Sequence, residues 1–211
     1  MTKIVIVAGG PLGLSLPLED QVTIGVDRGC LTLLEAGLSL DWAVGDFDSV
    51  TIEERNRIFE HAQHVVELAA EKNDTDLEVA LRVVLEHFPQ GEVTVYGALG
   101  GRLDHSLANL FWPSQAEFAP LLDRVQLVDD QNRVLYRGPG WQTVAPLVGF
   151  TYVSFMVEPD SPFEIEGARY PLNASNYFYK KIYGSNEFLD RPIRLRVEKG
   201  YVLIIYSRDR R

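Results

Sequence analysis

The hydrophobic positions of the first 130 residues fall into short, nearly uninterrupted runs. These runs are KIVIV (3–7), QVTIGV (21–26), DWAV (41–44), HVVEL (64–68), EVTVYG (92–97) and RVQLV (124–128). Because few polar residues interrupt them, they are typical of strands that are covered on both faces, as in a parallel α/β sheet.

Helix-like segments separate these runs. In TDLEVALRVVLEHF (75–88), apolar side chains recur at helical spacing, at Leu77, Ala80, Leu81, Val84, Leu85 and Phe88. Thr75 followed by Glu78 predicts a capping box at the start of this helix. The segment HSLANLFW (105–112) predicts another helix, which ends before Pro113.

After residue 130 the pattern changes to the alternation of half-buried strands. The clearest segments are TYVSFMV (151–157), PFEIEGARY (162–170) and IRLRVEKGYVLIIY (193–206), in which Lys199 and Gly200 suggest a hairpin turn. We therefore expect two domains, an α/β domain with a parallel sheet over residues 1–130 and an all-β domain, folded as a β-sandwich, over residues 131–211.

Composition narrows the class of protein. The chain has 211 residues, 46% of them hydrophobic, which is enough for a buried core. A formal net charge of −10, with no basic patch before the C-terminus, argues against binding to nucleic acid or to anionic membranes. One cysteine, Cys30, leaves no internal disulfide, and no secretion signal or bilayer-length run is found, so we expect a cytoplasmic protein.

Aspartates follow the predicted strands at their carboxyl ends. Asp27 follows VTIGV, Asp46 and Asp48 follow WAV, Asp74 and Asp76 follow HVVEL after a loop, and Asp104 follows VTVYG and a glycine turn. In an open parallel sheet these ends share one edge, where ligands bind. Converging carboxylates need bound cations or strongly raised pKa values. Oxygen ligands without histidine or cysteine favour Mg²⁺, which usually completes its coordination with phosphates and water.

Each of these motifs also has an ordinary structural interpretation. Asp76 fits the N-terminus of its helix, while Asp27 and Asp48 fit turns. Gly97, Gly100 and Gly101 precede Arg102 in a glycine-rich turn that could approach an anion, but such turns are common in α/β proteins. Their shared edge is what favours a site for phosphate chemistry.

Four motifs in order along the chain resemble the thiamine diphosphokinase (thiamine pyrophosphokinase) family. They are GDFDSV (45–50), EKNDTDLEVAL (71–81), GALGGRLDHSLANL (97–110) and YGSNEF (183–188), and the segments IVAGGP and GVDRG fit the same family. The resemblance implies an α/β domain followed by a β-sandwich, and transfer of a diphosphate group from ATP to the hydroxyl of thiamine with release of AMP.

The resemblance also implies roles for single residues. Asp46, Asp48, Asp74 and Asp76 would form the catalytic acidic site, in which Asp46, Asp48 and Asp74 hold Mg²⁺. ATP would contact Asp27, Gly100, Gly101, Arg102, Asp104, His105 and Asn109. Thiamine would contact Ser185 and Asn186 of the β domain, in a homodimer whose sites are shared between subunits.

One position departs from the family pattern, and other functions stay open at this point. Family members often carry a further aspartate where this chain has Asn73, which supplies an oxygen but no charge. The alternatives are a diphosphokinase for another alcohol such as a pterin, a non-catalytic small-molecule sensor with a structural metal ion, and a Mg²⁺-dependent phosphohydrolase.

Overall fold

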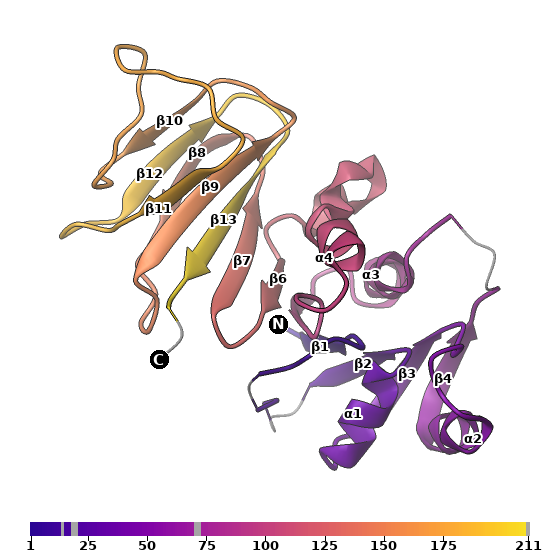
Figure 1. The fold of residues 1–211 in the computed structure, drawn as a ribbon. Helices are drawn as coiled ribbons and strands as arrows, with labels where there is room; N and C mark the ends of the chain where they lie inside the picture. Colours follow the sequence, from indigo (N-terminus) through magenta and orange to yellow (C-terminus); the bar gives the residue numbers. More distant parts are fainter. Residues whose placement is uncertain (14, 18–20, 70–72, 210–211) are drawn as a thin grey trace. The chain divides into compact units, whose positions relative to one another are not determined.

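A computed structural model describes residues 1–13, 15–17, 21–69 and 73–209 of the chain, which divides into two compact units, Met1–Asp130 and Gln131–Arg211 (Figure 1). We call them the α/β unit and the β unit. Among the helices of the described ranges, none is both long enough and apolar enough to cross a bilayer.

The α/β unit is built on a parallel sheet with the strand order β6-β5-β1-β2-β3-β4. Its strands are β1 (Lys3–Val7), β2 (Val22–Val26), β3 (Leu40–Gly45), β4 (Ala62–Glu67), β5 (Glu92–Tyr96) and β6 (Val125–Val128). All the strands predicted in this part of the sequence are confirmed. The carboxyl ends of these parallel strands share one edge of the sheet, and that edge positions the acidic residues.

Helices cover the two faces of this sheet. They are α1 (Gly29–Glu35), α2 (Ile52–His61), α3 (Asp76–His87) and α4 (Leu103–Leu110), with 3₁₀ turns η1 (Trp112–Ser114) and η2 (Ala116–Leu121). Figure 1 shows α1 and α2 on one side of the sheet and α3 on the other. The predicted capping box of α3 is present, and α2 begins with a second one, formed by Thr51 and Glu54.

The expectation that both faces of every strand are covered is wrong for β4. This strand lies at the edge of the sheet, and all six of its residues are exposed or half-buried. The central strands β1 and β2 are buried as predicted. An apolar run therefore indicated a strand here but not its place in the sheet.

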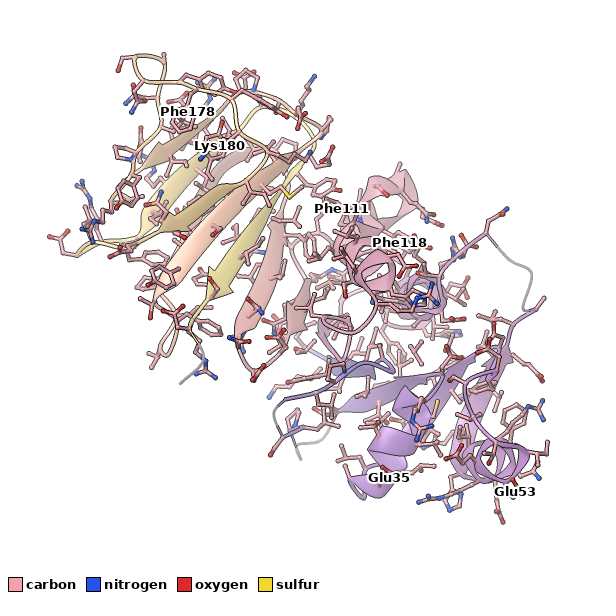
Figure 2. The ribbon with its side chains drawn as sticks, in the orientation of Figure 1. Glu35, Glu53, Phe111, Phe118, Phe178 and Lys180 are labelled. Atoms are coloured by element: carbon pink, nitrogen blue, oxygen red, sulfur yellow. The ribbon has the colours of Figure 1, made fainter. Side chains whose placement is uncertain are left out.

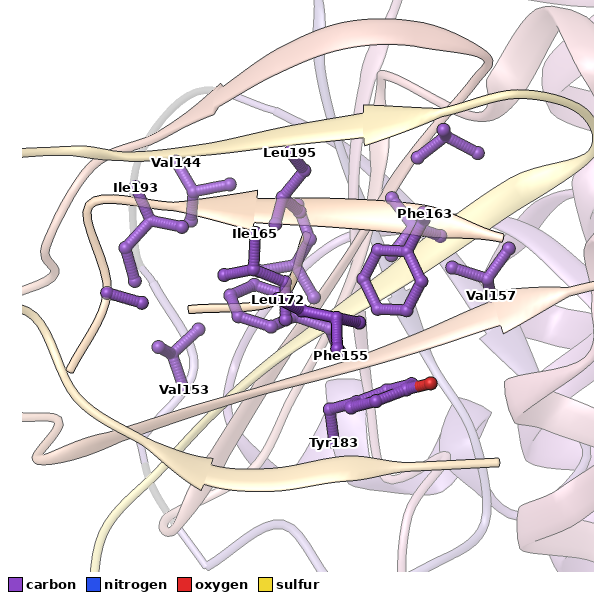
Figure 3. Packing of buried hydrophobic residues seen from close by; sticks show 14 of the residues in the cluster. Val144, Val153, Phe155, Val157, Phe163, Ile165, Leu172, Tyr183, Ile193 and Leu195 are labelled. Atoms are coloured by element: carbon purple, nitrogen blue, oxygen red, sulfur yellow. The ribbon is translucent and has the colours of Figure 1, made fainter. Parts of the chain in front are cut away.

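The β unit is a sandwich of two antiparallel sheets. One sheet has the order β11-β9-β13-β7, formed by Tyr183–Asn186, Tyr152–Glu158, Tyr201–Ser207 and Asn132–Arg137. The other has the order β10-β12-β8, formed by Phe163–Glu166, Ile193–Val197 and Gly140–Val144. Figure 3 shows the side chains that pack between them, among them Phe155, Ile165 and Leu195. The predicted fold class is thus confirmed.

The predicted hairpin across Lys199 and Gly200 is wrong. β12 pairs with β10 and β8, whereas β13 pairs with β7 and β9, so the turn carries the chain from one sheet to the other. Gly200 has φ +74°, and a Cβ there would lie 2.0 Å from the carbonyl oxygen of Glu158 at the end of β9. Alternation in the sequence identified which side chains face the core, but not which strand is the partner.

Candidate active site

The ends of β2 and β3 are tied together by Asp27. This residue follows β2 directly and has φ +48°, a conformation that non-glycine residues adopt only rarely. Its Oδ1 accepts a hydrogen bond from the backbone N–H of Phe47 at 3.2 Å. Gly45, at the end of β3, leaves the space for this carboxylate, because a Cβ there would lie 2.0 Å from the same oxygen.

Phe47 explains how two aspartates stand one residue apart. Its backbone has φ +57° and its ring is only 3% exposed, packed edge-on against Phe59 with ring centroids 5.3 Å apart. With Phe47 anchored in the core, Asp46 is half-buried and Asp48 is exposed to solvent. The backbone N–H of Asp48 donates to Asp46 Oδ1 at 3.2 Å, which offsets part of the negative charge.

Asp76, the first residue of α3, joins this group. Its side chain is hydrogen-bonded to that of Asp27. Burial and then the charge of Asp76 raise the pKa of Asp27 to about 7, and Asp46 adds a smaller contribution, while the N–H of Phe47 acts in the opposite direction. The structure therefore brings together three acids, from the end of β2, the end of β3 and the start of α3. We call Asp27, Asp46 and Asp76 the acidic cluster.

Asp74 has a different partner. Its carboxylate receives two hydrogen bonds from the guanidinium of Arg82, at 3.0 and 3.1 Å, and this pairing lowers the pKa of Asp74. Arg82 also pairs with Glu117 of η2, at 2.7 Å. A metal ion at Asp74 would have to share this carboxylate with Arg82 or displace Arg82 from it. Glu71 and Lys72, which open the same sequence motif, lie outside the described residues, and Asn73 is exposed.

The glycine-rich turn after β5 is held by the helix that follows it. Gly100 and Gly101 have φ of +86° and +74°. Asn109 Nδ2 donates to the carbonyl oxygen of Ala98 at 2.9 Å, and Ser106 Oγ donates to that of Gly100 at 3.0 Å. The predicted Asn109 is thus a support of the turn in this structure.

Arg102 and Asp104 pair with each other across this turn. The two hydrogen bonds measure 2.6 and 3.2 Å, and both side chains are largely exposed. This pairing lowers the pKa of Asp104 to about 2. The backbone N–H of His105 also donates to Asp104, at 3.0 Å, while the residue itself is exposed. Arg102 can therefore reach an anion in solvent without first leaving the protein interior.

Ser185 and Asn186, the predicted thiamine contacts, have very different surroundings in the β unit. Asn186 is 3% exposed, and its amide bonds both the N–H and the carbonyl oxygen of Tyr170, at 3.0 and 2.8 Å. Ser185 is exposed, with φ +56°, and its backbone N–H donates to Ser154 Oγ. The Ser185 hydroxyl is therefore the group that faces solvent, and the Asn186 amide is occupied.

A metal ion at the acidic edge would need ligands from outside the protein. In the part of the chain that the structure describes, no group of three His, Cys, Asp or Glu side chains is arranged to hold a metal ion. The oxygen donors of Asp46 and Asp48 nevertheless suit Mg²⁺, which proteins usually hold through one or two carboxylates together with substrate phosphates. Burial, and after it the charges of Asp76 and Asp46, raise the pKa of Asp27, and a cation would relieve the part of this effect that comes from the charges.

Sequence reasoning missed two residues that shape the site. Phe47 is the anchor between two acids, and its signal was a large apolar residue inside a charged loop. Arg82 is the partner of Asp74, and its signal was a basic residue on the polar side of a helix with an apolar face. Neither signal identifies a partner without the fold.

Comparisons with known proteins agree over nearly the whole chain. Residues 15–118 match the family model for the catalytic domain of thiamin pyrophosphokinase, and residues 143–202 match the model for its vitamin B1 binding domain. A thiamine pyrophosphokinase of Bacillus subtilis (strain 168) is 35% identical, covering 99% of this chain and 100% of that protein.

Solved structures give the same result. The crystal structure of a thiamin pyrophosphokinase family protein from Enterococcus faecalis has a TM-score of 0.90 and 36% identity, covering 99% of this chain and 100% of that one. The crystal structure of thiamine pyrophosphokinase from Bacillus subtilis has a TM-score of 0.82 and 34% identity, again covering 99% and 100%.

Proposed function

Because this chain belongs to the thiamine pyrophosphokinase family, and so transfers a diphosphate group from ATP to thiamine with release of AMP, we propose that the acidic cluster is part of its catalytic centre. The observation that supports this is the meeting of Asp27, Asp46 and Asp76 at the strand ends of the unit that matches the catalytic domain. Family membership also decides against the pterin kinase, the sensor and the phosphohydrolase.

Mg²⁺ is the metal ion that we propose for this centre. Asp46 and Asp48 would hold this ion together with the phosphates of ATP, and the ion would neutralise the negative charge of the phosphates. Asp76 interacts with Asp27 of the acidic cluster, whereas the carboxylate of Asp74 is paired with Arg82. A metal role for Asp74 remains a prediction, in which Arg82 would share this carboxylate with the metal ion or leave it.

ATP phosphates would also meet the glycine-rich turn. Gly100 and Gly101 leave the backbone open to close approach, and the exposed Arg102 offers a planar set of donors to phosphate oxygens. Arg102 would exchange its partner Asp104 for the phosphates, which leaves Asp104 and His105 free to contact the nucleotide. Asn109 would act by supporting the turn.

Thiamine would be bound by the β unit, and we propose that the working form is a homodimer. The match of residues 143–202 to the vitamin B1 binding domain supports the first part. The Ser185 hydroxyl would contact thiamine, with Asn186 holding the strand that carries it. By resemblance to the family, the β unit of one chain would serve the acidic cluster of its partner. Use of ATP favours a cytoplasmic location.

The test is to incubate the purified chain with ATP, Mg²⁺ and thiamine and to identify the products by mass. The variants Asp46→Asn and Asp48→Asn should each lower kcat by at least about 10²-fold, because one electrostatic contact to developing charge is commonly worth that much. Glu35→Gln is the matched control, since Glu35 is an exposed acid at the far end of α1 from Asp27 (Figure 2). Near-normal turnover of both Asp variants at saturating Mg²⁺ would contradict the assignment.

A further inference from the structure

The β unit contains a cavity that the acidic cluster and the Ser185 hydroxyl do not explain. It has a volume of about 430 Å³ and lies under the segment 169–180, with Ile165 and Leu172 among its apolar lining residues. Small-molecule sites typically have volumes of roughly 300–1,000 Å³. Gly184 and Asn186 line this cavity but Ser185 does not, so it is distinct from the surface that we assign to thiamine.

Aromatic rings form its walls. Tyr170 and Phe178 are 57% and 52% exposed, whereas Tyr183 is only 9% exposed. The Tyr183 hydroxyl donates to the carbonyl oxygen of Phe178 at 2.6 Å, and the two rings lie 5.5 Å apart. Rings held in this way offer flat, apolar surfaces on which a planar ligand can stack.

The cavity is held open by hydrogen bonds within the β unit. The Asn186 amide bonds both backbone groups of Tyr170, and the Tyr183 hydroxyl also accepts a hydrogen bond from the N–H of Lys180 at 3.1 Å. These contacts fix the two ends of the segment 169–180 to β11. Preorganisation of this kind lowers the entropy cost of binding a ligand.

The charged residues that line the cavity are cationic. Nη1 of Arg169 pairs with both carboxylate oxygens of Glu187, at 2.9 and 3.0 Å. The other N–H donors of the guanidinium can therefore bind a ligand. The Lys180 side chain has no ion pair with any of the described residues. In a chain of net charge −10, a lysine and an arginine beside aromatic rings favour an anion over a cation such as thiamine.

We propose that this cavity binds a planar heteroaromatic compound that carries a phosphate or diphosphate group. Both products of the reaction, thiamine diphosphate and AMP, have this chemistry, whereas thiamine has the ring without the phosphate. The ring would stack against Tyr170 and Phe178, and the phosphate would pair with Lys180 and Arg169. Figure 2 labels Phe178 and Lys180 in the β unit. All the residues that line this cavity belong to the β unit, whereas the acidic cluster and the proposed metal ligands belong to the α/β unit.

Equilibrium binding to the full chain in buffer with EDTA tests this proposal, because phosphate binding at the acidic cluster needs the metal ion. The probes are thiamine diphosphate and AMP, each paired with its phosphate-free form, thiamine and adenosine. Lys180→Met should lower the affinity for the product that occupies the cavity by at least about tenfold, which is the usual effect of losing one charge-assisted hydrogen bond. Lys199→Met, at an exposed turn of the same unit, is the matched control and should leave binding unchanged.

Testing both products shows which one binds in the cavity. It is the product whose affinity is lower for Lys180→Met than for the wild type. Asp48→Asn should leave this metal-free binding unchanged, so failure of the metal-site assignment and failure of the cavity proposal give different results. No binding of either product, or equal binding by Lys180→Met and Lys199→Met, would overturn the proposal. It would also fail if thiamine alone bound, and bound more tightly to Lys180→Met.

Discussion

Ionisation of Asp27 opposes folding of the α/β unit near neutral pH. Its carboxylate is partly buried beside Asp76 and Asp46, and its pKa is raised from 3.8 to about 7. Between these two pH values the folded chain binds more protons at Asp27 than the unfolded chain does. The free energy of unfolding of the metal-free protein should therefore decrease as the pH rises through this window.

Asp27→Asn removes that charge and keeps an oxygen for the N–H of Phe47. With EDTA present, we expect the variant to melt at least about 3 °C above the wild type at pH 8, the shift that about 1 kcal/mol produces in a chain of this size. The difference should shrink as the pH falls towards 4. Thermal unfolding followed by circular dichroism measures this difference in melting temperature. A variant that is less stable than the wild type at pH 8 would show that the charge of Asp27 does not destabilise the folded chain.

Asp74 and Asp76 differ in their partners, and this difference predicts different effects of the same substitution. Asp76→Asn changes the acidic cluster and should lower kcat by at least about 10²-fold. Asp74→Asn removes one partner of Arg82, which keeps Glu117, so its kcat should fall by less than about tenfold. Steady-state kinetics across Mg²⁺ concentrations compare the two, and equal losses would mean that Asp74 leaves Arg82 and binds the metal ion.

At the scale of the element, the capping box of α3 connects stability with the site. Thr75 lies between Asp74 and Asp76, and its hydroxyl oxygen accepts a hydrogen bond from the backbone N–H of Glu78 at 3.2 Å. Thr75→Ala should lower the free energy of unfolding by roughly 1 kcal/mol and should also reduce kcat/KM, because the N-terminus of α3 positions Asp76. Thr75→Ser keeps the hydroxyl and should restore both, whereas loss of activity in both variants would indicate a role for the Thr75 methyl group instead.

Elements were predictable where one physical signal was enough. The runs at 3–7 and 92–97 are short and rich in β-branched residues, which favours strands over buried helices. Thr75 with Glu78 marks a helix start by local hydrogen bonds. The hairpin at 199–200 failed because pairing is decided by the whole sandwich. β12 and β13 are consecutive in sequence, but each completes a different sheet.

At the scale of the whole molecule, the sequence indicated which strand ends carry acids but not how the side chains are directed. The positive φ of Asp27 directs its carboxylate inward, and that of Phe47 directs its ring into the core. Neither residue type predicts a positive φ from the sequence. The family resemblance implied that Asn186 contacts thiamine, and in the structure its amide is hydrogen-bonded to the backbone of Tyr170 in its own unit. Side-chain direction depends on contacts that are distant in sequence.

The shared site of the proposed homodimer can be tested by mixing inactive chains. Asp48→Asn should abolish the activity of its own chain's acidic site by removing a proposed Mg²⁺ ligand. Ser185→Gly should remove the thiamine contact without backbone strain, because glycine readily adopts φ +56°. Asn186 is left intact, since its buried amide supports the β unit. If chains exchange freely, half of the dimers are mixed and each has one intact site, so about a quarter of the wild-type activity should return.

Exchange itself must be measured in the same mixture, for example by native mass spectrometry of chains that differ in isotope content. Mixing Asp48→Asn with Asp46→Asn is the control, because both substitutions damage the same half of the site and no intact site can form. Activity that returns only in the first mixture would mean that the β unit of one chain serves the acidic cluster of its partner. Proven exchange with no recovered activity would mean that each chain builds its site from its own two units.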